Sequence, residues 1–485
     1  MPEPAPGAPP PHFIVLVPGY MGSRLRSRST GEMVWLDLPS LLKDPFEIPQ
    51  AIQGLFAQMH YPNDDLEPDG IIDQIVFLPP LFKQQHYGRL LEALARWGYS
   101  LPGGAPLPGK PRVYTFAYDW RQDNRLSAQQ LAQAVQGWRA ENPGARAWLI
   151  GHSNGGIVSR WYIEKEGGKE HVERLFLMGS PWDGAPKSLQ VLLKGMDMFL
   201  VRLLSASVDI PALTRQLMLS FPSFYQLVPN YFPFLRDEND QPIDPYSDMS
   251  WLETGAQRQM LQDARQFNMD LGTTLSVDSL CFFGVKQPTT TSGVRHLEPG
   301  GEWQITWDQT EAGDGTVPQR SAIHPQAREK LPYAAGHGDI YVVPPVLEKL
   351  EFELVSKYGL GVLAALVTER LAIQFEPQGE VFAPGEAIPV WASLRQRQSG
   401  APVFGAQVSV QAVLSQALPG SDSETSEPSP EIQMEASLRV AGRYEGELIA
   451  PQTPGYYRLV ARVTVPGENP VELEELVLVE AAPEL

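Results

Sequence analysis

One serine in a glycine-rich pentapeptide has the residue type and the setting for covalent chemistry. Gly-His-Ser-Asn-Gly spans residues 151–155 and has Ser153 at its centre. A serine hydroxyl is a weak nucleophile near neutral pH, so it needs a base that takes its proton and a third group that orients the base. Such a trio would cleave an ester through an acyl-serine intermediate. The alternative interpretation is a serine in an ordinary glycine-rich bend.

The segments on either side favour the nucleophile. The pentapeptide follows the apolar run "AWLI" and precedes a segment with helical periodicity. In a strand–turn–helix unit, the tight turn pushes the serine side chain out above the edge of the sheet. Gly151 and Gly155 leave room for that turn, and Gly156 lets the helix approach. His152 is part of the turn, and we do not expect it to act as the base.

The base and the acid are expected downstream. When a serine has this setting, the chain order is Ser, then Asp or Glu, then His. The segment "AGDGTVP" places Asp314 in a glycine-flanked loop, and "AAGHGDI" places His337 in another. His324, which precedes a proline, is the alternative base. Asp308 and Asp339 are the alternative acids. We predict a triad of Ser153, Asp314 and His337.

The tetrahedral intermediate also needs hydrogen-bond donors for its oxyanion. One predicted donor is the backbone N–H of Asn154, directly after the nucleophile. The loop "LVPGYMGSRL" follows the first predicted strand and bends at Pro18-Gly19, so the backbone N–H of Tyr20 is the second. The alternative interpretation of this loop is a simple strand-to-loop turn.

The elements that must position these residues form an α/β pattern. Short β-rich runs alternate with helical stretches from residue 13, which predicts a mostly parallel sheet with helices on both faces. The helix between the second and third strands is predicted to begin at an N-cap, Ser127, and to end at 142–144, Asn-Pro-Gly. The predicted strands are 13–17, 112–118, 147–150 and 172–178.

Two further regions differ in composition from this core. Residues 187–270 are rich in Leu and Met with interrupted helical periodicity, which predicts a helical lid that makes transient contact with a lipid surface. The alternative is a helical subdomain with an ordinary core.

After a helical stretch near 344–369, short alternating segments predict an antiparallel, immunoglobulin-like β-sandwich over 371–485 that covers or stiffens the catalytic domain. Within it, 419–431 is predicted to be a mobile loop. The predicted domains are thus a flexible leader over 1–12, a catalytic domain over 13–370 and the sandwich.

Composition excludes several classes of function. The 485 residues predict two domains. The net charge of −19 disfavours nucleic acid and anionic lipid surfaces as partners. The single cysteine, Cys281, excludes an intramolecular disulfide and a thiolate zinc site. With no His-x-x-x-His pair either, we expect no metal and no cofactor. The absence of signal-peptide features and of an 18-residue apolar run predicts a cytoplasmic protein with no membrane span.

Seven sequence blocks in one order resemble the lecithin:cholesterol acyltransferase family, which includes lysosomal phospholipases and phospholipid:diacylglycerol acyltransferases. The match covers roughly residues 13–345. The animal relatives carry disulfides, which one cysteine cannot form, and the β-rich C-terminal region is not part of those enzymes. The blocks are "VPGYMGSRL", "WLD" (35–37), "AYDWR" (117–121), "LIGHSNGG" (149–156), "GSPWDGAP" (179–186), "FPSFYQLVP" (221–229) and "GDGTVP" (313–318).

The resemblance implies an α/β-hydrolase fold that removes an ester-linked acyl chain from a lipid and passes it to water or to an alcohol. It also implies the same triad and oxyanion donors, with Met21 and Trp182 beside the substrate pocket. Two alternatives stay open: a carboxylesterase for smaller esters, and a non-catalytic binding or scaffold protein. If His337 is the base, activity falls as the pH drops through the imidazole pKa, near 6.5 when unperturbed.

Overall fold

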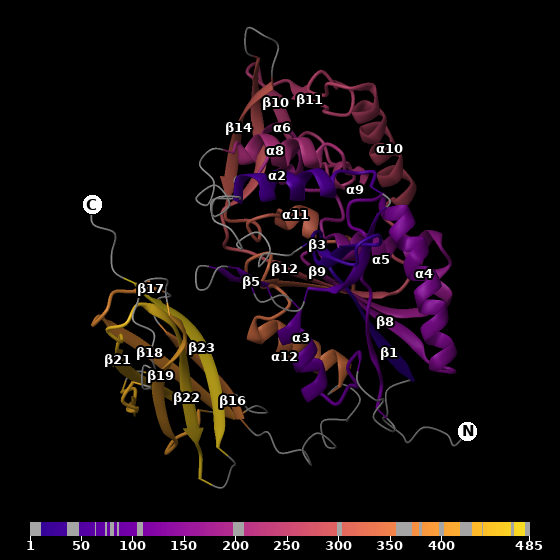
Figure 1. Cartoon of the computed structure of the whole chain (residues 1–485). Coiled ribbons are helices and arrows are strands. Elements are labelled where there is room, and N and C mark those ends of the chain that lie inside the picture. The colour runs from indigo at the N-terminus through magenta and orange to yellow at the C-terminus, as the bar shows by residue number, and fades with distance from the viewer. Residues whose placement is uncertain are drawn as a thin grey trace. The chain divides into compact units, whose positions relative to one another are not determined.

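In a computed structural model, the chain consists of two compact units (Figure 1). The first unit comprises Met1–Gln74 and Gln85–Leu360, and the second comprises Ile75–Gln84 and Gly361–Leu485. Most of the predicted leader and of the predicted loop at 419–431 lies outside the described residues. The structure describes residues 11–35, 48–63, 65–72, 75–77, 82–84, 87–103, 110–196, 208–297, 303–355, 371–377, 381–396, 402–417, 429–438, 440–466 and 470–480.

A six-stranded parallel sheet forms the centre of the first unit, as the alternating pattern predicts. The strands lie in the order β15-β12-β9-β8-β1-β7, and every neighbouring pair is parallel. The carboxyl ends of all six strands therefore meet at one edge of the sheet. The strands are β1 (His12–Val17), β7 (Val113–Thr115), β8 (Arg146–His152), β9 (Val172–Met178), β12 (Asp278–Gly284) and β15 (Glu329–Tyr333).

Strand β1 shows how the sheet is covered on both faces. Phe13, Val15 and Val17 are buried in a core with residues of α4 and α5, whereas Ile14 and Leu16 are buried in a second core with residues of α3 and α12. This alternation follows from the period of two along a strand. Figure 1 shows the two helix pairs on opposite faces of the sheet. The helices are α3 (Gly88–Arg96), α4 (Asn124–Glu141), α5 (Asn154–Lys165) and α12 (Pro344–Leu354).

Two predicted boundaries are wrong. The N-cap of α4 is Asp123, whose side chain accepts a hydrogen bond from the backbone N–H of Arg125 at 2.8 Å. Ser127 is fully buried one turn inside the helix, so it contributes to packing and not to capping. His12 belongs to β1 and not to a leader, because its ring stacks on Trp148 at 3.8 Å and is 6% exposed.

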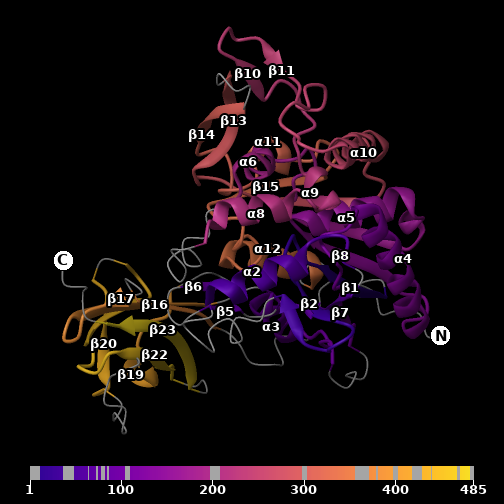
Figure 2. The ribbon, with the colours of Figure 1, turned by 45° about the horizontal axis from the view of Figure 1, so that its top comes forward.

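The stretch 187–270 lies beyond the carboxyl edge of the sheet and is not purely helical. Its strands β10 and β11 pair with β13 and β14 in a four-stranded sheet, in the order β11-β10-β13-β14. Figure 2 shows these strands at one end of the unit, with α10 close by. The sequence predicted the helices but not the strands. The elements are α6 (Pro186–Lys194), α8 (Ile210–Met218), α9 (Pro222–Tyr225), β10 (Leu235–Asp237), β11 (Pro242–Ile243), α10 (Gly255–Leu271), β13 (Thr289–Leu297) and β14 (Trp303–Thr310).

Smaller elements lie along the chain before and between these larger ones. Strands β2, β3 and β4 form a three-stranded sheet in the order β3-β2-β4. Strands β5 and β6 pair as a hairpin that is grouped with the second unit. These elements are β2 (Ser23–Ser27), β3 (Met33–Trp35), α2 (Ile48–Met59), β4 (Leu66–Ile71), β5 (Ile75–Phe77), β6 (Phe82–Gln84), the 3₁₀ helix η1 (Gly168–Glu170) and α11 (Gln319–Ala322).

The described residues of the second unit form β-strands and their connections, as the alternating segments predict. All neighbouring strands are antiparallel except β17 and β23, which are parallel. Inward-facing residues of several strands form one apolar core. The immunoglobulin-like topology stays a prediction, and β17 and β20 were not predicted. The strands are β16 (Leu371–Pro377), β17 (Val381–Phe382), β18 (Ala387–Gln396), β19 (Gln407–Ala417), β20 (Ile432–Ala436), β21 (Arg443–Ile449), β22 (Gly455–Thr464) and β23 (Val471–Val479).

Candidate active site

Ser153 lies in a strained turn between β8 and α5. Its φ of 50° and ψ of −125° are rare for a residue with a Cβ and cost about 1–3 kcal/mol. The surroundings impose this conformation: the N–H of Ser153 donates to the Met178 carbonyl at 2.9 Å, and the Ser153 carbonyl accepts from the Gly156 N–H at 3.0 Å. The strand, the turn and the helix thus have the arrangement expected around a nucleophilic serine, and Ser153 itself is 8% exposed.

Two glycines of the pentapeptide are required by close backbone packing. A Cβ on Gly151 would lie 2.7 Å from the Cα of Gly156. A Cβ on Gly155 would lie 2.8 Å from the carbonyl carbon of Val17, which ends β1. Real Cβ contacts essentially never fall below 3.0 Å. The turn therefore packs directly against its own helix and against the end of β1.

The structure brings Ser153, His337 and Asp314 into one hydrogen-bonded chain. His337 Nε2 is 2.9 Å from Ser153 Oγ, and His337 Nδ1 is 2.8 Å from Asp314 Oδ2. The second carboxylate oxygen, Oδ1, accepts from the backbone N–H groups of Thr316 at 3.0 Å and Val317 at 2.7 Å. A carboxylate only accepts hydrogen bonds, so Nδ1 carries the imidazole proton. Nε2 of neutral His337 is then free to accept the serine proton.

The loops that hold these three residues lie beside the carboxyl ends of strands of the six-stranded sheet. Ser153 follows β8, and His337 follows β15. Asp314 lies beside the end of β12, since a Cβ on Gly284 would lie 2.5 Å from the Cβ of Asp314. In addition, the backbone N–H of His337 donates to the Asp314 carbonyl at 2.8 Å, which ties the two loops together.

Two opposing effects set the pKa of His337. Burial by itself lowers this pKa, but the charge of the Asp314 carboxylate and its hydrogen bond raise it by more. The net pKa of His337 is raised above 6.5. The imidazolium that forms when serine gives up its proton is therefore stabilised, as a general base requires.

The alternative acids and base lie in other surroundings. His324 is fully buried beside the Trp182 ring, 5.1 Å away, and burial lowers its pKa to about 3. Asp308 lies on β14 and accepts a hydrogen bond from the Ser292 hydroxyl. Asp339 is exposed. The hydrogen bonds of these three groups therefore do not involve Ser153.

Both predicted oxyanion donors belong to loops that adjoin Ser153. A Cβ on Gly19 would lie 2.9 Å from the Cβ of Ser153, so the loop with Tyr20 packs against the serine turn. Asn154 is the first residue of α5, and the first four N–H groups of a helix have no acceptor within it. The positive end of the helix dipole adds to this environment. The donor roles of Tyr20 and Asn154 stay predictions.

The side chain of Asn154 does structural work. Its amide exchanges two hydrogen bonds with the amide of Asn124, at 2.9 and 3.0 Å, and donates to the Tyr118 hydroxyl at 3.2 Å. The Tyr118 hydroxyl in turn donates to the Pro18 carbonyl at 3.0 Å. The start of α5 is thereby fixed to the loop after β1. No sequence motif marks Asn124.

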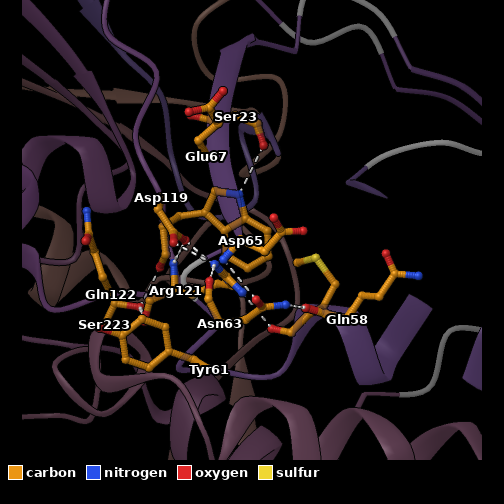
Figure 3. Close-up of polar contacts among 12 residues, drawn as sticks. Ser23, Gln58, Tyr61, Asn63, Asp65, Glu67, Asp119, Arg121, Gln122 and Ser223 are labelled. Atoms are coloured by element: carbon orange, nitrogen blue, oxygen red, sulfur yellow. Dashed lines mark hydrogen bonds and ion pairs between the residues drawn. The ribbon is translucent and has the colours of Figure 1, made fainter. Parts of the chain in front are cut away.

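The block "AYDWR" supports the same loop from the other side. The indole N–H of Trp120 donates to the Ser23 carbonyl at 3.1 Å. Arg121 is fully buried, pairs with Asp119 at 2.7 Å and donates to the Met59 carbonyl at 3.1 Å (Figure 3). A buried guanidinium needs such partners. The role of this block is therefore to hold the chain segments around the site.

Apolar side chains of 187–270 contact the predicted oxyanion loop. The Tyr20 ring lies 5.0 Å from the rings of Trp120 and Phe224, and its hydroxyl donates to Met218 Sδ at 3.4 Å. Phe224 belongs to α9 and Met218 to α8. Both helices therefore contact the side chain of Tyr20 through apolar residues.

The two predicted pocket residues differ in their surroundings. Met21 is half-buried in the loop with Tyr20, has a φ of 62°, and its carbonyl accepts a hydrogen bond from the Trp35 indole. The Trp182 indole donates to the Ile323 carbonyl at 2.9 Å, away from the hydrogen bonds of Ser153. The pocket roles of Met21 and Trp182 stay predictions.

No three His, Cys, Asp or Glu side chains among the described residues group closely enough to hold a metal ion. Within the same ranges, every helix is too short or too polar to cross a membrane.

Comparison with known proteins confirms the family resemblance. The lecithin:cholesterol acyltransferase family model matches residues 61–296. Lysosomal phospholipase A and acyltransferase from Bos taurus is 23% identical over 369 residues, which is 66% of this chain and 83% of that protein. The Homo sapiens protein of the same name is 24% identical over 365 residues, 65% of this chain and 81% of that protein. The family match includes Ser153 but ends before Asp314 and His337.

Solved structures are similar over much of the chain at low identity. The crystal structure of the Tle4–Tli4 complex has a TM-score of 0.49 at 16% identity and covers 74% of this chain and 99% of that one. The mature Bacillus licheniformis lipase BlEst2 has a TM-score of 0.32 at 14% identity and covers 72% of this chain and 95% of that one.

Proposed function

We propose that this relative of the lecithin:cholesterol acyltransferases is a serine enzyme that cleaves ester-linked acyl groups of lipids and passes them to water or to an alcohol. The observation that carries the proposal is the hydrogen-bonded chain from Ser153 through His337 to Asp314 at a strand–turn–helix. The relatives named as phospholipase A and acyltransferase support a lipid ester as the substrate.

The first half of the reaction forms the acyl-serine. Neutral His337 takes the proton of Ser153 through Nε2 as the hydroxyl attacks the ester carbonyl carbon. The Asp314 carboxylate stabilises the resulting imidazolium, and the backbone N–H groups of Tyr20 and Asn154 bind the oxyanion. His337 then gives its proton to the leaving alcohol as the carbon–oxygen bond breaks.

The second half repeats these steps with an acceptor. Water or an alcohol gives a proton to His337 while its oxygen attacks the acyl carbonyl, and Ser153 leaves with that proton restored. Both acceptors use the same three side chains. Hydrolysis and transfer are therefore separated by competition: an added long-chain alcohol that becomes acylated identifies an acyltransferase, and release of free fatty acid alone identifies a hydrolase.

A fluorophosphonate tests the nucleophile without a known substrate. We expect intact-mass analysis to detect one phosphonyl adduct on the wild type and none on Ser153→Ala. Ser159→Ala is the matched control, because Ser159 lies on the same helix with its hydroxyl bonded to the Gly155 carbonyl, and it should be labelled normally. An unlabelled wild type would favour the scaffold alternative.

A series of nitrophenyl esters tests the substrate class. The apolar contacts of Tyr20 with α8 and α9 support long acyl chains, so kcat/KM should be higher for eight-carbon than for two-carbon esters. A preference for two carbons would favour the small-ester carboxylesterase. Release of labelled fatty acid from phospholipid vesicles then tests the lipid directly.

The remaining assignments are proposals that rest on the sequence. We propose that 187–270 acts as a lid, and that the second unit covers or stiffens the catalytic unit. We also propose a cytoplasmic location, which the single cysteine favours. Deleting the second unit tests its role, since lost solubility indicates structure, whereas selective loss of vesicle binding indicates recognition.

A further inference from the structure

A second chain of hydrogen bonds passes behind the nucleophile. The backbone N–H of Gly19 donates to the Tyr87 hydroxyl at 2.7 Å, the Tyr87 oxygen is 2.7 Å from His152 Nδ1, and His152 Nε2 is 2.9 Å from the His337 carbonyl oxygen. A carbonyl oxygen only accepts, so His152 Nε2 carries a proton. In neutral His152, Nδ1 then accepts the proton of the Tyr87 hydroxyl. The hydrogen bonds therefore all have the same direction: Gly19 donates to Tyr87, Tyr87 donates to His152, and His152 donates to the His337 carbonyl.

The two side chains of this hydrogen-bonded chain are buried. Tyr87 is 1% exposed and His152 is 7% exposed. The Tyr341 ring stacks on Tyr87 at 4.8 Å and meets His152 edge-on at 4.6 Å. Burial raises the pKa of Tyr87 well above its usual value, so its hydroxyl stays protonated. Hydrogen bonds in such surroundings hold their partners more firmly than bonds in water.

This chain of hydrogen bonds connects two loops, the one with Gly19 and Tyr20 and the one with His337, which both adjoin Ser153. Gly19 directly precedes Tyr20, the predicted oxyanion donor. The His337 backbone is held on both sides, because its N–H donates to the Asp314 carbonyl at 2.8 Å and its carbonyl accepts from His152. The peptide groups around His337 are thereby fixed, and with them the position of its ring.

We infer that His152 and Tyr87 are positioning residues, which hold the oxyanion loop and the base loop in register with the nucleophile. The inference rests on the proposed function. His152 is suited to this role because it directly precedes Ser153, so a single residue connects the turn, Tyr87 and the base loop. Catalytic groups displaced by about 1 Å lose on the order of 100-fold in rate.

The main test measures the second-order rate of fluorophosphonate labelling of Ser153. Tyr87→Phe removes the bridging hydroxyl and should lower this rate about 10-fold or more. His152→Ala removes both hydrogen bonds and should lower it further. His152→Gln keeps a side-chain N–H at a similar reach from the backbone, so it should recover part of the loss. Tyr341→Phe is the matched control: its ring stays in the same stack, its hydroxyl has no partner among the described residues, and its rate should be that of the wild type.

A pH profile distinguishes positioning from other effects. Burial and the Asp314 carboxylate together determine the pKa of His337, and neither variant replaces Asp314. The pH profiles of Tyr87→Phe and His152→Gln should therefore have lower rates at every pH and an unchanged midpoint. A sideways shift of the midpoint would mean that His152 acts on the His337 charge, and would overturn the inference. A normal labelling rate with a lowered melting temperature would also overturn it, because the role would then be stability alone. A wild type that is not labelled would refute the proposed function itself. If the wild type is labelled and Tyr87→Phe is labelled at the same rate, only the inference is refuted.

Discussion

Replacing Asp314 by asparagine tests the reasoning about the base most directly. The two carboxylate oxygens have different partners, because Oδ1 accepts from two backbone N–H groups and Oδ2 accepts from His337 Nδ1. An asparagine would keep its oxygen towards the backbone and turn its NH₂ towards the imidazole. Nδ1 would then accept a hydrogen bond from that NH₂, and the imidazole proton would move to Nε2. Nε2 of His337, which faces Ser153, would then carry a proton and could not accept the serine proton.

The magnitude follows from the cost of reversing the amide. The productive tautomer needs the amide oxygen towards His337, which leaves the N–H groups of Thr316 and Val317 without an acceptor. Each unsatisfied buried donor costs about 1–3 kcal/mol, so the reversal costs about 2–6 kcal/mol. At about 1.4 kcal/mol for each factor of ten, Asp314→Asn should lose roughly 30-fold to 10⁴-fold in the acylation rate. The equivalent change in a serine protease triad lowers kcat by about 10⁴.

The assay is the rate of acyl-serine formation at pH 8, measured from the nitrophenol burst and from fluorophosphonate labelling. Asp339→Asn makes the same atomic change at an exposed carboxylate two residues from His337, and should remain within about twofold of the wild type. If Asp314→Asn keeps a third or more of the wild-type rate while Asp339→Asn loses activity, the assignment of the acid is wrong.

Three further predictions follow from the same structure. Because the pKa of His337 is raised, kcat/KM for a neutral ester should fall as the pH drops and be half-maximal above pH 6.5, whereas a flat profile from pH 5 to 8 would exclude this base. Gly155→Ala should lower the melting temperature by several degrees, because the new Cβ would approach the Val17 carbonyl carbon to 2.8 Å, and an unchanged melting curve would contradict that packing. Burial, partly offset by Arg320 and other positive charge nearby, raises the pKa of Asp183 to about 6, so its ionised form is penalised at higher pH. Asp183→Asn should therefore raise the melting temperature at pH 8 and leave it unchanged at pH 4.

The hydrogen-bonded chain of Ser153, His337 and Asp314 could be predicted because its signals are local and ordered along the sequence. Ser153, Asp314 and His337 each lie in a glycine-flanked loop, and the carboxyl ends of parallel strands meet at one edge. That rule brings together residues 184 positions apart without knowledge of any tertiary contact. The parallel sheet itself was predicted from the same alternation of short strands and helices.

Other features depend on tertiary packing, and no pattern in the sequence predicts them. Asp123 and Ser127 are both suitable N-caps, and only the burial of Ser127 decides between them. Strands β10 and β11 are two or three residues long and exist because they pair with β13 and with each other. Tyr87 lies 65 residues from His152 in the sequence, and no motif marks it.

The hydrogen bonds of Tyr87 and His152 show why sequence motifs describe only part of such a site. Oxyanion donors and a base are effective when they are fixed before the substrate arrives, because no reorganisation is then needed in the transition state. Loops alone do not provide that rigidity. Here the loop after β1 is held by Tyr87, Tyr118 and Trp120, and the base loop is held by Asp314 and His152. In the proposed mechanism Tyr87, Tyr118, Trp120 and His152 take no part in proton transfer, yet the distances that permit it depend on them. Their loss should therefore lower the rate while leaving the triad itself chemically intact.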